Sequence, residues 1–105
     1  MAWLAAEPDD DIRVELQALI DSDPELLATR FSGCLTFGTA GLRAEIGAGP
    51  LRMNRLVVRQ AAAGLADWLL SHVDDASQRG VVIGYDARRK SDLFALDTAY
   101  VLAAR

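Results

Sequence analysis

A glycine-rich turn followed closely by an arginine is the part of this chain best equipped for chemistry. Gly38 and Gly41 enclose Thr39. Arg43 stands two residues beyond the second glycine. Glycines permit positive φ and close approach of a ligand to the backbone, and a hydroxyl with exposed N–H groups can surround an anion. A guanidinium adds a planar fork that matches phosphate oxygens. The pattern indicates a phosphate site, although an ordinary tight turn with a surface arginine has the same spacing.

A second group of charged residues follows the apolar run 81–85. Asp86 and Arg88 come directly after this run, which has the β-branched composition of a strand buried on both faces. Open α/β sheets bind ligands beyond the carboxyl ends of their strands. Arg88 could therefore help to hold a phosphate, with Asp86 orienting a neighbouring arginine. A structural salt bridge beside a helix is the alternative.

The single cysteine and the single histidine carry less weight. Cys34 has no basic partner nearby in the sequence and is predicted to be a small buried core residue. His72 ends a helical pattern, where packing or an interaction with the helix dipole is expected. No nucleophile and no metal site is predicted within the chain.

Helical signals dominate the first third of the chain. Apolar residues at helical spacing over residues 12–20 follow the acidic run 9–11, which suits the positive end of a helix. Asp23 then offers an N-cap and Pro24 a first helical residue, so a second short helix is predicted, ending at Gly33.

Strand and helix signals alternate in the remainder. Residues 34–37 are predicted to form a short strand that enters the glycine turn, and residues 44–53 a loop or irregular hairpin. A long helix is expected from Asn54 to His72, after which residues 74–80 form a polar linker. One face of this helix is predicted to follow helical spacing through Asn54, Val57, Ala61, Leu65, Trp68, Leu69 and His72.

The last predicted elements are the strand 81–85 and a helix that follows it. Ser91 is predicted as the N-cap of this helix, with Asp92 in its first turn. The order of elements indicates an α/β fold, with helices layered on a small mixed or parallel sheet. Two strands make a marginal sheet, so we expect an incomplete domain.

Length and composition limit the possible functions. The 105 residues suffice for one small domain. The net charge of −4, from 15 acidic and 11 basic residues, argues against a nucleic-acid partner. One cysteine permits no intrachain disulfide, and no window approaches the roughly 20 apolar residues that span a bilayer. We therefore expect a cytoplasmic protein without a membrane partner.

Several motifs in register resemble one known family. The string Phe-Gly-Thr-Ala-Gly-Leu-Arg at residues 37–43 is similar to the opening signature of the α-D-phosphohexomutases, the phosphoglucomutase and phosphomannomutase superfamily. Residues 47–49, 52–54 and 82–88 continue the likeness, which covers about residues 35–104. Ala44 departs from it, since many relatives have glycine there. The resemblance implies a helical extension over residues 1–32 and a partial first domain over residues 33–105.

The resemblance also implies a mechanism. An active-site phosphoserine transfers its phosphoryl group to a sugar phosphate, and the sugar bisphosphate then returns its other phosphoryl group. Sugar 1-phosphates and 6-phosphates, or 5-phosphates for pentoses, are interconverted in this way. Arg43 matches an arginine at the mouth of the active site, and Gly38, Thr39 and Gly41 shape its loop. Asp86 and Arg88 are supporting residues, and the cofactors implied are Mg²⁺ and a sugar bisphosphate activator.

The family's other signatures are missing from these residues. Its phosphoserine, magnesium, sugar and second phosphate loops do not occur in the sequence. We therefore expect the N-terminal part of an isomerase, inactive alone, with the catalytic serine beyond Arg105. Its partners would be the phosphosugar and the remaining domains of the parent chain. The alternatives are a short non-catalytic binding module that keeps this fold, and an unrelated small α/β anion binder.

Overall fold

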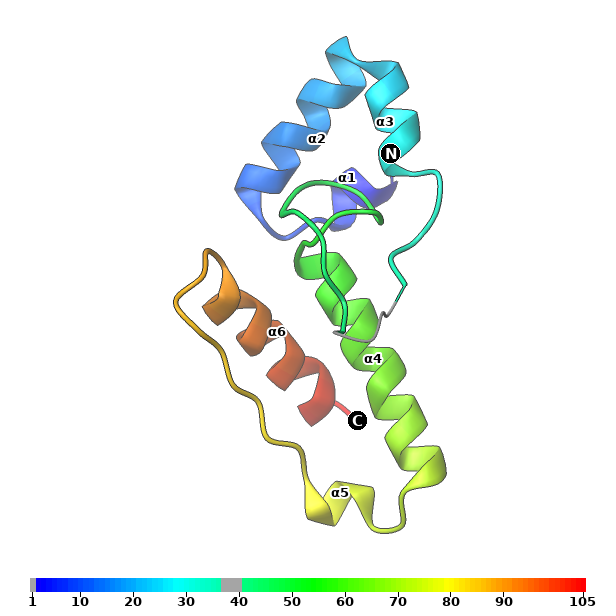
Figure 1. Ribbon diagram of the computed structural model, residues 1–105, viewed down its shortest axis with the longest axis vertical. Coiled ribbons are helices and arrows are strands. Elements are labelled where there is room, and N and C mark those ends of the chain that lie inside the picture. The colour runs from blue at the N-terminus through cyan, green and yellow to red at the C-terminus, as the bar shows by residue number, and fades with distance from the viewer. Residues whose placement is uncertain (1, 37–40) are drawn as a thin grey trace. The chain divides into compact units, whose positions relative to one another are not determined.

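The computed structural model describes residues 2–36 and 41–105 of the chain. It forms two compact units, Met1–Val57 and Val58–Arg105, which are described one at a time. The described residues form the following helices: α1 (Ala2–Ala6), α2 (Asp10–Ser22), α3 (Pro24–Arg30), α4 (Arg55–His72), α5 (Ala76–Arg79) and α6 (Ser91–Ala103) (Figure 1).

Helix α2 forms where the sequence predicts it. The Asp9 side chain caps the helix by accepting a hydrogen bond from the backbone N–H of Asp11, at 3.2 Å. Carboxylates at this end also face the positive pole of the helix dipole. Ile12, Leu16 and Leu19 are buried, as their helical spacing predicts. The acidic start and the apolar face of α2 are thus confirmed.

Helix α3 also begins as predicted. The carboxylate of Asp23 accepts a hydrogen bond from the backbone N–H three residues later, and Pro24 is the first helical residue. The helix ends at Arg30, and Phe31 is its C-cap. The prediction that Gly33 ends the helix is therefore wrong, because the last turn closes earlier with backbone bonds to the Phe31 N–H.

The core of the first unit joins its helices to a loop. Ile12, Leu16 and Ala48 are its buried centre. Trp3 packs edge-on against Phe31, with ring centroids 5.5 Å apart, and both border this centre. The apolar face of α2 is therefore buried partly by residues 47–49, and Figure 1 shows this loop beside the helices of its unit.

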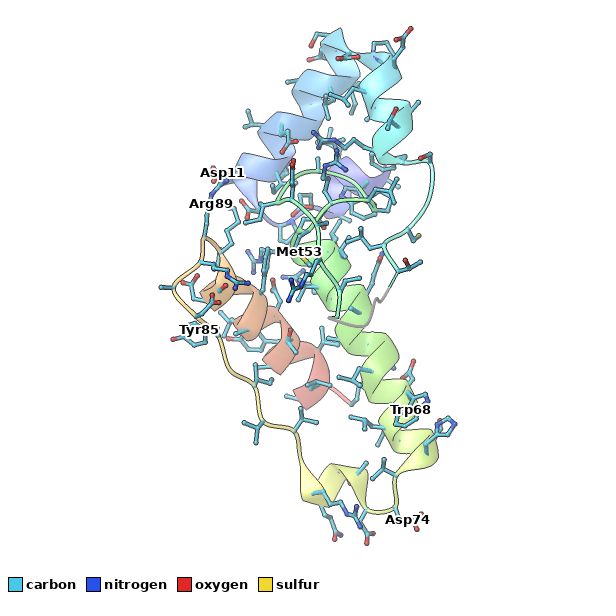
Figure 2. All side chains as sticks on the ribbon, in the orientation of Figure 1. Asp11, Met53, Trp68, Asp74, Tyr85 and Arg89 are labelled. Atoms are coloured by element: carbon cyan, nitrogen blue, oxygen red, sulfur yellow. The ribbon has the colours of Figure 1, made fainter. Side chains whose placement is uncertain are left out.

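In the second unit, α4 buries a narrower face than its sequence predicts. Ala62 and Ala66 are buried, whereas Leu65 is 46% and Trp68 54% exposed. Figure 2 shows the Trp68 side chain projecting from the helix. The prediction of a buried Leu65 and Trp68 is wrong. Arg59, one helical turn before Ala62, pairs with a buried carboxylate of α6.

That carboxylate belongs to Asp97, which is 1% exposed. The Arg59 Nη2 and Nε atoms lie 2.9 and 3.1 Å from Asp97 Oδ1. A buried charge is costly unless it is paired. The pair therefore compensates the burial of the Asp97 carboxylate and links α4 to α6.

The two predicted strands do not form among the described residues. An isolated parallel bridge joins Ile46 and Met53. The run 81–85 lacks strand pairing, and Val82 is 98% exposed. Cys34 is also exposed, so its predicted place in the core is wrong. A strand needs a neighbour that pairs its backbone groups in a ladder, and in the described part of the chain the single bond from the Leu35 N–H to the Pro50 carbonyl does not make one.

Two local predictions in the second unit also need correction. The residue before α6 is Lys90, in the left-handed region with φ of +65°, and Ser91 is the first residue of the helix. Ser91 is therefore not the N-cap. The linker at 74–80 contains the single-turn helix α5.

Among residues 2–36 and 41–105, no helix has the length and apolar character needed to cross a membrane.

Candidate phosphate-binding site

The described part of the glycine turn presents Arg43 to solvent. Gly38 and Thr39 lie outside the described residues. Gly41 has a φ of +93°, a conformation that favours glycine. Arg43 is exposed, and no hydrogen bond or ion pair joins it to another residue in the described part of the chain. Its guanidinium is thus available to a ligand.

One loop is hydrogen-bonded to the near flank of the turn and continues directly from its far flank. On the near side, the Leu35 N–H donates to the Pro50 carbonyl at 3.2 Å. On the far side, the Met53 N–H donates to the Glu45 carbonyl at 2.7 Å, and the Gly47 N–H donates to the Met53 carbonyl at 3.1 Å. Residues 45–54 therefore form a hydrogen-bonded loop that binds Leu35 before the turn and follows directly after the segment that carries Arg43. We call residues 45–54 the base loop.

Asn54 holds the base loop together from its last position. Its side chain is fully buried, and Nδ2 donates to the carbonyls of Gly47 and Gly49, each at 2.9 Å. Its Oδ1 accepts a hydrogen bond from the Val57 N–H at 2.9 Å, which caps the first turn of α4. The sequence analysis missed this role. The available signal was an asparagine immediately before a helix, where N-caps are preferred.

Arg30 contacts the base loop from the side of the N-terminal helices. Its Nη1 atom lies 2.6 Å from Glu15 Oε1 and 3.3 Å from the Ala48 carbonyl oxygen. The Arg30 carbonyl in turn accepts a hydrogen bond from the Leu51 N–H at 3.3 Å. One residue of α3 thus binds the loop through both its side chain and its backbone. No feature of the sequence analysis pointed to it.

The second predicted group lies in the other unit and forms a local turn. Asp86 Oδ1 accepts hydrogen bonds from the Arg88 N–H at 3.0 Å and the Ser91 hydroxyl at 2.9 Å. Arg88 Nε lies 3.2 Å from Asp86 Oδ2. The Arg88 backbone bond and then the Ser91 hydroxyl lower the pKa of Asp86, so the carboxylate stays charged. Arg88 is largely exposed. The geometry accommodates both a ligand-binding arginine and a structural ion pair.

The contacts of His72 are those of a structural residue and not of a catalytic one. It is the last residue of α4, and its Nδ1 atom lies 2.9 Å from the Trp68 carbonyl oxygen. The two rings stack, with centroids 4.6 Å apart. This agrees with the predicted packing role. Among the residues outside 1 and 37–40, no three histidine, cysteine, aspartate or glutamate side chains gather in a way that could hold a metal ion.

Comparison with known proteins identifies the family to which this chain belongs. Residues 35–105 match the family described as phosphoglucomutase/phosphomannomutase, alpha/beta/alpha domain I. The chain belongs to this family, which confirms the resemblance of the glycine turn and the motifs after it. The α/β class is therefore that of the family domain, while the described residues show its helices without a sheet.

The individual relatives include phosphomutases and a sugar bisphosphate synthase. The chain is 47% identical over 100 residues to a probable phosphoribomutase of Schizosaccharomyces pombe, an alignment that covers 94% of this chain and 17% of the relative. It is 51% identical over 73 residues to a phosphoglucomutase of Staphylococcus saprophyticus, covering 70% of this chain and 13% of that protein. A glucose 1,6-bisphosphate synthase of Mus musculus is 34% identical over 110 residues, an alignment that covers 98% of this chain and 18% of that protein.

The coverage of these alignments says two things about the chain. It spans less than a fifth of the length of these curated relatives. The alignment to the fission yeast protein covers 94% of the chain, so it includes most of the helical segment before residue 35. No solved structure gave a significant match.

Proposed function

We propose that this chain is the N-terminal part of a mutase that interconverts phosphorylated sugars, and that Arg43 binds a phosphate group in its active site. The observation that carries the proposal is the family match over residues 35–105, which includes the exposed Arg43. The named relatives include phosphoribo-, phosphogluco- and phosphopentomutases. Their common chemistry is the movement of a phosphoryl group on a sugar.

In the proposed reaction, a phosphoserine transfers its phosphoryl group to a free hydroxyl of the sugar phosphate. The hydroxyl proton passes to the serine oxygen, and a sugar bisphosphate forms. The other phosphoryl group of the bisphosphate is then transferred to the serine oxygen, the serine proton passes to the sugar oxygen that is freed, and the isomeric monophosphate remains. We place the phosphoserine in the part of the full-length protein that this chain does not span, and we expect the chain alone to be inactive.

Arg43 would contribute charge and orientation. The phosphate of the sugar carries negative charge throughout the reaction, and phosphoryl transfer depends mainly on positioning and electrostatic stabilisation. An exposed guanidinium can form two parallel hydrogen bonds to phosphate oxygens. We propose that Gly38, Thr39 and Gly41 shape the turn around the same anion, and that Asp86 and Arg88 support it.

The metal implied by the family is not assigned to this chain. The described residues hold no cluster of acidic or imidazole side chains that fits Mg²⁺, so we derive no step through the metal. We propose that the full-length protein binds Mg²⁺ elsewhere, and that a sugar bisphosphate primes the phosphoserine. Both would be supplied in the assay.

The test is a mutase assay of the full-length protein with Mg²⁺ and a catalytic amount of sugar bisphosphate. Glucose 1-phosphate, mannose 1-phosphate and ribose 1-phosphate would be compared as substrates. We expect Arg43→Ala to lower kcat/KM about 10- to 100-fold, because a charge-assisted hydrogen bond contributes about 1.5–3 kcal/mol.

A matched control is Arg79→Ala, which removes another exposed arginine, at the end of α5. We expect it to leave kcat/KM unchanged. A full-length protein that turns over none of the sugar phosphates would contradict the proposed activity. Equal turnover by the wild type and Arg43→Ala would contradict the proposed role of Arg43 but not the proposed mutase activity.

A further inference from the structure

Helices α1–α3 precede the family domain, yet one of their residues is built into the base loop of the candidate site. We propose that Arg30 is a positioning residue for Arg43, so that the N-terminal helices form part of the framework of the phosphate site. The inference rests on the proposed function of Arg43. It goes beyond the family match, which begins at residue 35.

The first step of the argument is the bond set of Arg30. Its side chain is only 14% exposed, and the single atom Nη1 bridges Glu15 Oε1 at 2.6 Å and the Ala48 carbonyl at 3.3 Å. Ala48 is itself fully buried in the core. The guanidinium thus joins α2, α3 and the base loop at one point, where a partly buried charge needs both partners.

The second step is the close fit between the loop and this contact. A Cβ atom on Gly47 would lie 3.1 Å from Arg30 Nη1 and 3.2 Å from Glu15 Oε1. A Cβ atom on Gly49 would lie 3.1 Å from both Arg30 Cβ and the Arg30 carbonyl oxygen. The loop backbone therefore rests directly on Arg30, and a change of the side chain must shift the loop or open a gap.

The third step connects the loop to Arg43. The base loop is paired through the Gly47–Met53 and Met53–Glu45 backbone hydrogen bonds, and Arg43 stands two residues before Glu45. A displacement of residues 45–49 is therefore carried to the start of the segment that bears the guanidinium. Phosphate recognition by a planar fork tolerates errors of only about 0.5 Å, and small misplacements can reduce the rate about 100-fold.

The test uses steady-state kinetics of the full-length protein with the phosphosugar that it turns over. Arg30→Lys keeps the positive charge but loses the planar group that reaches both partners. We expect it to raise KM for the phosphosugar about 10-fold, in the same direction as Arg43→Ala. Glu15→Gln, which keeps an acceptor oxygen without the charge, should raise KM less and provides a milder variant if Arg30→Lys does not fold.

The matched control is Arg13→Gln. Arg13 lies on α2, is 52% exposed and is 3.8 Å from Asp10, so it is an arginine paired on the surface. We expect its KM to equal that of wild type. A purely structural role of Arg30 would lower the amount of folded enzyme and hence the apparent kcat, but it would leave KM unchanged.

The outcomes separate this inference from the proposed function. If Arg43→Ala raises KM while both Arg30→Lys and Glu15→Gln leave it unchanged, the positioning role is refuted and the function of Arg43 stands. If Arg43→Ala itself leaves KM unchanged, the assignment of Arg43 fails and the positioning role fails with it. A raised KM in Arg30→Lys with an unchanged KM in Arg13→Gln supports the inference.

Discussion

Replacement of Asn54 by alanine should destabilise the first unit more than any other single deletion of an amide. Asn54 is fully buried and makes three side-chain hydrogen bonds, each of 2.9 Å. Two of them satisfy the carbonyls of Gly47 and Gly49, and the third caps α4. Alanine removes all three and leaves the buried groups without those partners.

The size of the effect follows from these bonds. Loss of an N-cap costs about 1 kcal/mol, and each buried carbonyl that loses its donor adds about 1 kcal/mol or more. The expected loss is therefore about 3 kcal/mol. Domains of this size are stable by about 5–15 kcal/mol, so the variant should lose a large fraction of its stability. With a urea dependence of about 1–3 kcal/mol per M, the midpoint should fall by about 1–3 M.

The assay is equilibrium unfolding in urea, followed by tryptophan fluorescence. The chain contains two tryptophans, Trp3 in the first unit and Trp68 in the second. In a Trp68→Phe background the signal comes from Trp3 alone, which borders the core of the first unit. The control is Gln17→Ala, because the Gln17 amide makes one exposed hydrogen bond to Asp21 at 2.9 Å. Its effect should stay within about 0.5 kcal/mol.

A loss below about 1 kcal/mol in Asn54→Ala, or a loss equal to that of the Gln17 control, would refute the reasoning. Asn54→Asp adds a second criterion. It keeps an acceptor for the cap but turns a carboxylate oxygen toward two carbonyl oxygens, which raises the pKa of the new group. The variant should therefore be more stable in acid and lose stability as the pH rises through that pKa.

Further predictions concern glycines and one buried acid. Gly49→Ala should destabilise by about 1–3 kcal/mol, because φ is +98° and the added Cβ would meet Arg30 at 3.1 Å. Gly64 lies in the interior of α4, and a Cβ added there would meet nothing within 4 Å, so Gly64→Ala should stabilise the protein by about 0.5–1 kcal/mol. Equal shifts of the urea midpoints of Gly49→Ala and Gly64→Ala would contradict both predictions. Burial raises the pKa of Glu7, despite its hydrogen bond from the Asp9 N–H, so stability should fall as the pH rises from the ordinary value to the raised pKa. Thermal unfolding measured across that pH range should show that the stability of Glu7→Gln depends less on pH than that of the wild type. An equal pH dependence in the two proteins would exclude Glu7 as its source.

The helices of the first unit could be predicted because their signals are local. Asp9 and Asp23 act as N-caps within three residues of the N–H groups that they bind. Pro24 suits only the first turn of a helix. The burial of Ile12 and Leu16 follows from their spacing of four residues, which can be read directly from the sequence and places them on one face of a helix. Such elements are specified by neighbours along the chain, and the structure confirms them.

The sheet and the buried face of α4 depend on partners that are distant in sequence. The run 81–85 has strand composition, but composition supplies no hydrogen-bonding neighbour, and Tyr85 is 70% exposed at its end (Figure 2). In α4, apolar residues occur around much of the helix, so periodicity alone did not select a face. The Arg59–Asp97 pair, which joins residues 38 positions apart, is a contact of α4 that helical periodicity does not show.

The candidate site divides in the same way between local and distant information. The proposed phosphate site draws on glycines and an arginine within six consecutive residues, 38–43, so a sequence motif is enough to suggest it. The contacts that hold the base loop are not, because Arg30 reaches Glu15 across 15 residues and Ala48 across 18. Residues that bind a ligand can therefore be proposed from a short motif, whereas the residues that aim them must be found from packing. For this chain that distinction makes Arg30 the sharper test: Arg43 was expected from its motif, while a kinetic effect of Arg30 would follow only if the contacts of the base loop orient the site.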